Sequence, residues 1–293
     1  MFTLLAAAAP AAAQSYTVLH PFSSEQQYPR GLVQATDENF YGTTSQGGSN
    51  SLGSVFKITP AGTLTSLYSF SGSDGRKPYA TLVQGTDGNL YGTTYQGGTG
   101  NYGTVFKITP AGTLTTLYSF SGSDGANPYA GLVQGTDGTF YGTTSGGGTN
   151  YLGTVFAITP AGALTTLHSF ALSDGAEPYA GLMQGTDGNF YGTTASAGAN
   201  NYGTVFKVTP AGALTTLHSI AGNDGAVPYA GLVQGTDGNF YGTTEGGAIN
   251  GGTVFKITPA GTLTTLHTCA ISHGESPYAG LERGSEGNFY GTT

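Results

Sequence analysis

The stretch Gly185-Thr186-Asp187-Gly188-Asn189-Phe190-Tyr191-Gly192-Thr193-Thr194 recurs, with few changes, about every 50 residues along this chain. The block begins at Ala35, Gly85, Gly135, Gly185, Gly235 and Gly284, and the last step is one residue shorter than the others. A period of this length that contains several short strands is typical of a propeller-type array, in which each unit buries its faces against its neighbours. The repeat therefore predicts the architecture, and any function has to be sought on an array.

One unit, residues 131–170, contains four extended segments and no helical periodicity. The segments 132–134, 140–144, 154–159 and 164–170 are called strands A, B, C and D below. Asp137-Gly138 separates A from B and predicts a two-residue hairpin turn in which the glycine has a positive φ. Glu38 replaces this glycine in the first unit, so we expect a different turn there. With 51 glycines in the chain, an antiparallel four-stranded meander is favoured over helices.

Four strands per unit, repeated radially, predict an all-β fold of the β-propeller class; a β-helix is the alternative. We expect strand A to lie innermost, where blades crowd together, and strand D outermost. Because neighbouring strands alternate in direction, the A–B and C–D turns should share one face and the longer B–C and D–A loops the other. A ligand is expected at the long-loop face.

Both ends of the array look like partial units. Residues 16–22 align with strand D, five complete units follow, and a sixth A–B pair reaches Thr293. If the ring closes with six blades, the N-terminal D strand completes the last blade and removes an exposed sheet edge. The sequence therefore predicts either a piece of a longer protein, truncated on its C-terminal side, or a five-blade array with a frayed sixth blade.

The composition of the chain indicates where the protein is located and argues against some classes of partner. The chain has 293 residues, of which 38% are hydrophobic and only 8% charged, with a net charge of −8. Residues 1–13 are apolar and mostly small, which predicts a signal peptide or its remnant, and 14–293 should then form one exported repeat domain, secreted, at the cell surface or periplasmic. The apolar run is too short to cross a bilayer, so no transmembrane segment is expected. The negative charge argues against nucleic acid as a partner.

The order of motifs within each unit resembles one known family. Pro-Tyr-Ala-Gly-Leu-Val-Gln precedes the block that opens at Gly235, and Gly-Thr-Val-Phe-Lys-Ile-Thr-Pro-Ala-Gly and Leu-Thr-Thr-Leu follow it. This combination resembles the GloVer tandem repeat over nearly all of residues 16–293. The resemblance implies a secreted bacterial repeat protein with a β-propeller-like fold and no assigned activity, and it supplies no catalytic residues.

A tyrosine follows a proline at the entry to strand A in five units, and these tyrosines are our candidate ligand-binding residues. They are Tyr79, Tyr129, Tyr179, Tyr229 and Tyr278. Innermost strands line the channel mouth of a propeller, so the rings are expected to form an aromatic collar that contacts a glycan or another cell-surface polymer. Packing between adjacent blades is the alternative role.

Two sets of aspartates recur, one on each expected face. Asp87, Asp137, Asp187 and Asp237 precede glycine in the A–B turn, so a turn role is favoured for them. Asp74, Asp124, Asp174 and Asp224 lie on the long-loop face, where they are either turn residues or a candidate cation site, with Ca²⁺ as the ion. His20, His168, His218 and His267 occupy a strand D position that Tyr68 and Tyr118 share, which favours packing with a polar tip over metal binding.

These observations favour an exported, non-catalytic binding or surface-structural module. Residues repeated in every unit serve the unit first, and neither a Ser-His-Asp order nor a metal-ligand spacing occurs. Cys269, the single cysteine, stands where other units have Phe120 and Phe170, which predicts packing rather than reactivity. The alternative is a propeller enzyme, such as a polysaccharide hydrolase or lyase, that uses the unrepeated residues Arg76, Glu177, Glu245 and His273.

Overall fold

The structure of the chain is a computed structural model that describes residues 18–22, 26–247, 251–270 and 274–293. All regular secondary structure in these ranges is β, in five antiparallel sheets of four strands and one sheet of two. The predicted all-β meander is therefore confirmed. The signal-peptide prediction for residues 1–13 lies outside the described residues.

The strands of each sheet follow one another in chain order. The first sheet contains β1 (Gln26–Gln34), β2 (Phe40–Gly47), β3 (Ser54–Ile58) and β4 (Leu64–Ser69). The second contains β5 (Val83–Gln84), β6 (Leu90–Thr94), β7 (Thr104–Ile108) and β8 (Leu114–Ser119). The third contains β9 (Val133–Gln134), β10 (Phe140–Thr144), β11 (Thr154–Ile158) and β12 (Leu164–Ser169). The fourth contains β13 (Met183–Gln184), β14 (Phe190–Thr194), β15 (Thr204–Val208) and β16 (Leu214–Ser219). The fifth contains β17 (Val233–Gln234), β18 (Phe240–Thr244), β19 (Thr253–Ile257) and β20 (Leu263–Thr268), and β21 (Glu282–Arg283) pairs with β22 (Phe289–Tyr290).

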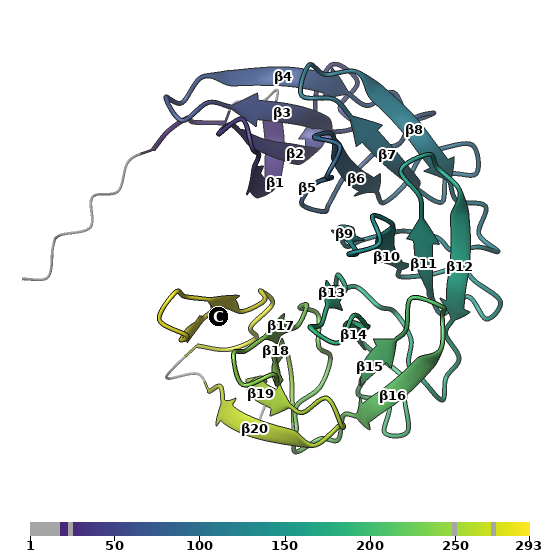
Figure 1. Cartoon of the computed structure of the whole chain (residues 1–293), viewed down its shortest axis with the longest axis vertical. Helices are drawn as coiled ribbons and strands as arrows, with labels where there is room; N and C mark the ends of the chain where they lie inside the picture. The colour runs from purple at the N-terminus through teal and green to yellow at the C-terminus, as the bar shows by residue number, and fades with distance from the viewer. Residues whose placement is uncertain (1–17, 23–25, 248–250, 271–273) are drawn as a thin grey trace, which may run out of the picture.

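The sheets are arranged as blades around a central opening (Figure 1). The first strand of each blade, such as β5 or β9, lies nearest the centre, and the fourth, such as β8 or β12, lies at the periphery. This is the predicted propeller order, with strand A innermost and strand D outermost. Each blade consequently presents its faces to the blades before and after it.

The repeated Phe-Tyr-Gly-Thr-Thr segment joins neighbouring blades. In the third blade, the Tyr141 ring stacks on Phe190 of the fourth, with centroids 3.9 Å apart. Gly142 leaves space for the buried ring of Phe156, because a Cβ at Gly142 would lie only 2.7 Å from its Cζ. The Thr143 hydroxyl donates to the Ala180 carbonyl of the fourth blade at 3.0 Å, and Thr144 Oγ1 lies 2.8 Å from Thr154 Oγ1 on strand C. Each residue of the Phe-Tyr-Gly-Thr-Thr segment therefore has a packing or hydrogen-bonding role in the array.

The core consists of several clusters, each between two blades. One such cluster joins Tyr141, Val155 and Phe170 of the third blade to Leu182 and Phe206 of the fourth. The Phe170 and Phe206 rings meet edge to face at 5.2 Å. Because the same contact recurs between the other blades, no blade buries its apolar faces alone.

The A–B turn differs from the predicted two-residue hairpin. Gly138 N–H donates to the Gly135 carbonyl at 2.9 Å, and Gly135 N–H donates to the Thr139 carbonyl at 2.8 Å. The loop therefore has three residues, with Gly138 at φ 80° in the left-handed position that follows a type I turn. The strand register agrees with a three-residue loop. Gln134 pairs with Phe140, so Gly135 lies opposite Thr139 and residues 136–138 form the loop.

The expectation of a different turn at Glu38 is wrong. Glu38 N–H donates to the Ala35 carbonyl and Ala35 N–H donates to the Asn39 carbonyl, each at 2.9 Å. Glu38 therefore adopts the same left-handed conformation, at φ 67°, that glycine adopts in the other units. The hydrogen bonds that close the loop impose the positive φ on Glu38. This backbone conformation is sterically unfavourable for a residue with a Cβ, so Glu38 is strained where glycine is not.

Exchanging the residues at this position should change stability in opposite directions. We expect Gly138→Val to lower the free energy of unfolding by about 1 kcal/mol or more, because a β-branched residue resists a positive φ. Crowding makes no contribution, since nothing lies within 4 Å of a Cβ at Gly138. Glu38→Gly should be neutral or stabilising in the same denaturant titration. A Gly138→Val protein as stable as the wild type would contradict this turn assignment.

The described residues at the two ends pack as parts of blades. Phe22 meets Phe56 edge to face at 5.3 Å, the contact that Phe70 makes with Phe106. Residues 18–22 thus lie against the first blade as the outer strand of a preceding blade does. At the other end, Phe289 of β22 stacks on Tyr241 at 4.1 Å, as Phe240 does on Tyr191.

Candidate functional site: the tyrosine collar

The five tyrosines that follow proline contact one another from blade to blade. The ring centroids lie 5.3 Å apart for Tyr79–Tyr129, 5.6 Å for Tyr129–Tyr179, 5.4 Å for Tyr179–Tyr229 and 5.6 Å for Tyr229–Tyr278. These distances are in the range of favourable aromatic pairs. We call this set of five rings the tyrosine collar. The structure thus brings all five predicted ligand-binding residues together, while their binding role stays a prediction.

Part of the collar lines a hollow large enough for a small ligand. Tyr129, Tyr179, Tyr229 and Tyr278 surround a cavity of about 390 Å³, within the usual size range of ligand pockets. Tyr129 is 40% exposed and Tyr278 60% exposed, so their rings present free aromatic surface. The same tyrosines therefore pack between adjacent blades and line an accessible cavity. The two predicted roles, packing and ligand binding, are compatible.

The hydroxyl groups of Tyr179, Tyr229 and Tyr278 have raised pKa values and stay neutral donors at physiological pH. Burial, followed by the nearby charge of Glu177, raises the pKa of Tyr179 above its ordinary value. Burial and the charge of Glu245 raise the pKa of Tyr229 in the same way. A hydrogen bond to Glu245 raises the pKa of Tyr278. The cavity therefore combines aromatic faces with O–H groups that donate hydrogen bonds.

A cation already lies on one ring of the collar. The first unit has Pro29-Arg30 in place of the Pro-Tyr pair, and the Arg30 guanidinium carbon lies 4.7 Å from the centroid of Tyr79. Arg30 Nη2 also donates to Ser45 Oγ at 3.3 Å. Sequence reasoning missed Arg30, because it breaks the Pro-Tyr pattern on which the collar was predicted.

Two variable positions per blade form the rim of the collar. One is the residue before Pro-Tyr, and the other is the residue after Gly-Thr-Thr. Backbone hydrogen bonds from the second to the first join them in each of four blades, as the pairs Lys77–Tyr95, Asn127–Ser145, Glu177–Ala195 and Val227–Glu245. Tyr95 also packs on Tyr79, with centroids 5.3 Å apart. We call these the rim pairs; their variation between otherwise similar units is the signal from which the rim could have been predicted.

The residue before Pro-Tyr has a left-handed backbone in every blade. The φ values are 55° for Lys77, 59° for Asn127, 58° for Glu177, 57° for Val227 and 55° for Ser276. This conformation is unfavourable for any residue with a Cβ, and most of all for a β-branched one such as Val227. Glu177 N–H donates to the Leu152 carbonyl and Ala176 N–H to the Ser196 carbonyl, both at 2.9 Å. The D–A loop is thus held between the B–C loops of two blades, and these loops share one face as predicted. The strained backbone conformation occurs at the residue that contributes a rim side chain.

Relieving this strain should stabilise the protein. We expect Val227→Asn to raise the free energy of unfolding by about 1 kcal/mol, because asparagine tolerates a positive φ and valine does not. The reciprocal change, Asn127→Val, should lower it by a similar amount or more, since it also removes the 2.9 Å hydrogen bond from Asn127 Nδ2 to the Tyr95 carbonyl. Thermal unfolding of the two variants, measured together, checks the prediction. A Val227→Asn protein less stable than the wild type would contradict it.

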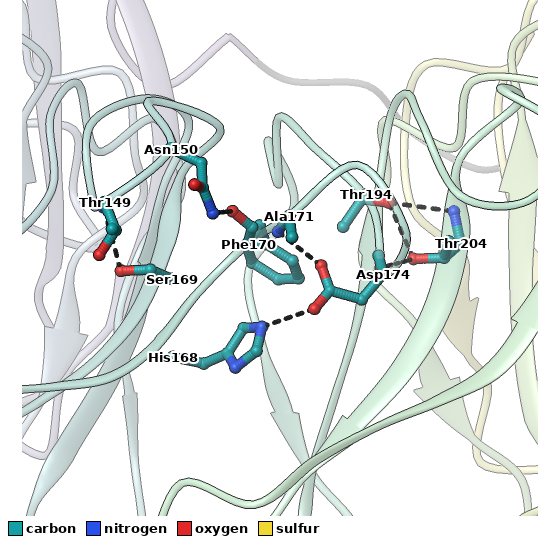
Figure 2. Close-up of polar contacts among 9 residues, drawn as sticks. All are labelled: Thr149, Asn150, His168, Ser169, Phe170, Ala171, Asp174, Thr194 and Thr204. Carbon is teal, nitrogen blue, oxygen red and sulfur yellow. Dashed lines mark hydrogen bonds and ion pairs between the residues drawn. The ribbon is translucent and has the colours of Figure 1, made fainter.

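Asp174 and its equivalents in other blades are bound within the fold. Figure 2 shows Asp174 accepting a hydrogen bond from Ala171 N–H at 2.7 Å and lying 3.0 Å from His168 Nε2. Its carbonyl accepts a hydrogen bond from Thr204 of the next blade at 3.0 Å. Asp74, Asp124 and Asp224 pair in the same way with Tyr68, Tyr118 and His218. These aspartates therefore tie strand D to the following loop, as in the turn alternative of the sequence prediction.

The alternative role of these aspartates, as a cation site, is not supported by a cluster of ligands. Within residues 18–22, 26–247, 251–270 and 274–293, no group of three or more His, Cys, Asp or Glu side chains could hold a metal ion. The hydrogen bond to Asp124, followed by burial, raises the pKa of Tyr118 to about 12, so the tyrosine stays a hydrogen-bond donor to this carboxyl group. The structure does not bring Asp74, Asp124, Asp174 and Asp224 together, and a role in binding Ca²⁺ stays a prediction.

The other aspartates serve the A–B turns as predicted. Burial would raise the pKa of Asp137, but hydrogen bonds from Tyr141 and Thr139 together hold it below its ordinary value. The Tyr141 hydroxyl donates to Asp137 Oδ2 at 2.8 Å, and the Thr139 amide donates to Oδ1 at 3.0 Å. Cys269 is buried, which raises the pKa of its thiol and agrees with a packing role.

Of the candidate catalytic residues, Glu177 and Glu245 lie near the same collar ring, since the charges of both raise the pKa of Tyr229. Glu177 and Glu245 belong to the rim pairs of neighbouring blades, whereas the Arg76 backbone pairs with Gln96 beside the second blade. His273 lies outside the described residues. In the part of the chain that the structure describes, no helix is long and apolar enough to cross a membrane.

Comparisons with known proteins agree with the repeat and the fold. A family model described as the Gloeobacter/Verrucomicrobia repeat matches residues 8–186 and 153–293. No curated protein gives a match. Among solved structures, a gluconolactonase from Xanthomonas campestris is 12% identical, with a TM-score of 0.57, 92% of this chain covered and 84% of that one. A structure provisionally described as a 6-phosphogluconolactonase from Bacteroides uniformis is 19% identical, with a TM-score of 0.57, 87% of this chain covered and 75% of that one. At these identities the similarity concerns the fold alone.

Proposed function

The chain belongs to the Gloeobacter/Verrucomicrobia repeat family, and from that premise we propose that it is an exported, non-catalytic binding module for a glycan or a similar cell-surface polymer. The observation that carries the proposal is the tyrosine collar. Four of its rings line one cavity, and each ring belongs to a different unit of the array. The polymer lies along the collar, with its faces against the rings.

The chemistry of the collar suits such a ligand. Tyrosine offers a large, rigid contact area with one polar end and little rotational freedom to lose on binding. The apolar faces of a sugar ring can stack on the aromatic faces, and sugar hydroxyls can accept hydrogen bonds from neutral tyrosine hydroxyls. The rim pairs add side chains that differ from blade to blade, which is how a repeated scaffold acquires selectivity.

Repetition strengthens weak contacts. Each blade presents a similar ring at a similar spacing, so a repetitive polymer can bind several rings at once. Linked contacts of this kind can raise avidity by about 10² or more without any single strong site. We propose that the protein meets the polymer outside the cytoplasm, on the basis of the small apolar residues 1–13 and the family resemblance.

A propeller enzyme is the second candidate function. Two observations favour it: the fold is shared with proteins described as lactonases, and the collar has unlike residues on its two sides, with Arg30 at one end and Glu245 at the other. A cleft with unlike groups from several blades is what an enzyme requires. Turnover of a lactone or polysaccharide would decide in its favour.

An array of glycans and cell-surface polymers, read with calcium and again with a chelator, tests the proposal. We expect binding of at least one polymer that persists in the chelator, because the collar needs no ion. Binding only with calcium would assign the contact to the Asp74, Asp124, Asp174 and Asp224 loops instead. A folded protein that binds no polymer contradicts the proposal and leaves a structural role, and product formation from an array member favours the enzyme.

A further inference from the structure

Charge is distributed unevenly around the tyrosine collar. Glu177 and Glu245 occur in the rim pairs of neighbouring blades, next to Tyr179 and Tyr229. Glu245 accepts a hydrogen bond from the Tyr278 hydroxyl, which places its carboxylate at the cavity wall. The positive groups of the collar, Arg30 and Lys77, belong to the opposite end, around Tyr79.

The cavity lies at the acidic end. Its lining consists of Tyr129, Tyr179, Tyr229 and Tyr278. Tyr79, which carries the Arg30 guanidinium, is not part of this lining. Glu177 and Glu245 do not line the cavity themselves, but each is next to a ring that does: Glu245 accepts a hydrogen bond from Tyr278, and the charge of Glu177 acts on Tyr179. A ligand in the cavity faces aromatic surface that is free of a protein cation.

No cation of the described chain neutralises these carboxylates. Neither of the ion pairs His168–Asp174 and His218–Asp224 involves Glu177 or Glu245. The polar contacts of the two glutamates are with neutral hydroxyls: Ser196 Oγ donates to Glu177 Oε2 at 3.3 Å, and Tyr278 donates to Glu245. Both carboxylates are thus available to an incoming positive group.

Tyrosine faces and carboxylates attract the same kind of ligand. A cation over an aromatic face is stabilised by the ring quadrupole, and an ammonium group donates strong hydrogen bonds to a carboxylate. The Arg30–Tyr79 contact shows this attraction within the collar itself. A neutral sugar would use the rings but leave both charges unpaired.

We propose that the cavity of the tyrosine collar recognises protonated amino groups, so that its ligand is an amine-bearing glycan. The inference rests on the proposed function and names the ligand class for the same site. The ammonium group lies against the rings of Tyr179 and Tyr229 and between the carboxylates of Glu177 and Glu245. The remaining rings contact the flanking sugars.

Isothermal titration calorimetry with two probes tests this proposal. The probes are a hexasaccharide of β-1,4-linked glucosamine and its fully N-acetylated counterpart, titrated at a pH at which the amines of the first probe are protonated. For the wild type we expect the amine probe to bind about ten-fold tighter or better than the acetylated one, with an advantage that shrinks as salt is added.

Charge-neutral variants locate the contact. The double variant Glu177→Gln, Glu245→Gln should bind the two probes equally, with the acetylated probe unaffected. Glu38→Gln is the matched control, because Glu38 lies in an A–B turn and its loss should leave the preference intact. Circular dichroism and thermal unfolding establish that each variant is folded.

The outcomes separate this inference from the proposed function. Equal affinity of the wild type for both probes would overturn the amine inference while supporting a glycan-binding collar. A preference that persists in the double glutamine variant would also overturn it, since the amine would then bind elsewhere. Absence of binding to either probe overturns the amine inference, and the polymer array then judges the binding function independently.

Discussion

Phe156→Ala is expected to lower the free energy of unfolding by about 3–5 kcal/mol, the usual cost of removing a buried phenylalanine. The Phe156 side chain has no exposed surface and belongs to the cluster between the second and third blades. Its ring meets Phe120 edge to face at 5.3 Å. Because the blades are stable only against one another, a cavity at this position weakens both. Denaturant unfolding followed by circular dichroism measures the loss.

Phe22 supplies the matched control for this prediction. It makes the same edge-to-face contact with Phe56, at 5.3 Å, but is 38% exposed. Phe22→Ala should therefore cost clearly less than Phe156→Ala, because less apolar area is lost and water can fill the space. Equal costs at the two positions would mean that the interfaces between blades are not the core.

Replacing Tyr79, Tyr129, Tyr179 and Tyr229 together by alanine should abolish polymer binding, a loss of about 10² or more in affinity. Tyr129→Ala alone should weaken binding only modestly, since the other rings still contact the polymer. Titration calorimetry with the polymer selected on the array measures both effects. The contrast between the single and the fourfold change is the expected signature of a repeated contact.

Tyr151→Ala is the control for the collar variants. Tyr151 is 81% exposed and lies on a B–C loop, outside the collar. Its loss should leave both binding and stability close to the wild-type values. If Tyr151→Ala weakened binding as much as the fourfold change, the ligand would lie on the B–C loops and the collar would be a packing feature.

The strand order and the inner position of the collar were predictable because every unit repeats the same segments in the same order. The Asp-Gly pair marks the turn between strands A and B in most units, even when the partner strands are not known. The length of the A–B loop was not predictable, because two- and three-residue turns both accept Asp-Gly. Glu38 shows why: the hydrogen bonds of the loop, rather than the residue, decide the conformation.

The contacts of the long-loop aspartates, such as Asp124 and Asp174, could have been predicted from the sequence. Asp124 follows Tyr118 by six residues, and Asp174 follows His168 by six, and these side chains are hydrogen-bonded. The constant spacing and the exchange of tyrosine for histidine, both able to donate to a carboxylate, were the signal. The Arg30–Tyr79 contact could not have been predicted from the sequence, because it depends on how two blades are oriented in space.

A crystal structure of the protein bound to the polymer fragment selected on the array would show whether the tyrosine collar is the binding site. We expect fragment density against the rings of Tyr129, Tyr179, Tyr229 and Tyr278, with polar groups of the ligand at Glu177 and Glu245. Density confined to the A–B turns, or to the Asp174 loop and its equivalents, would contradict it.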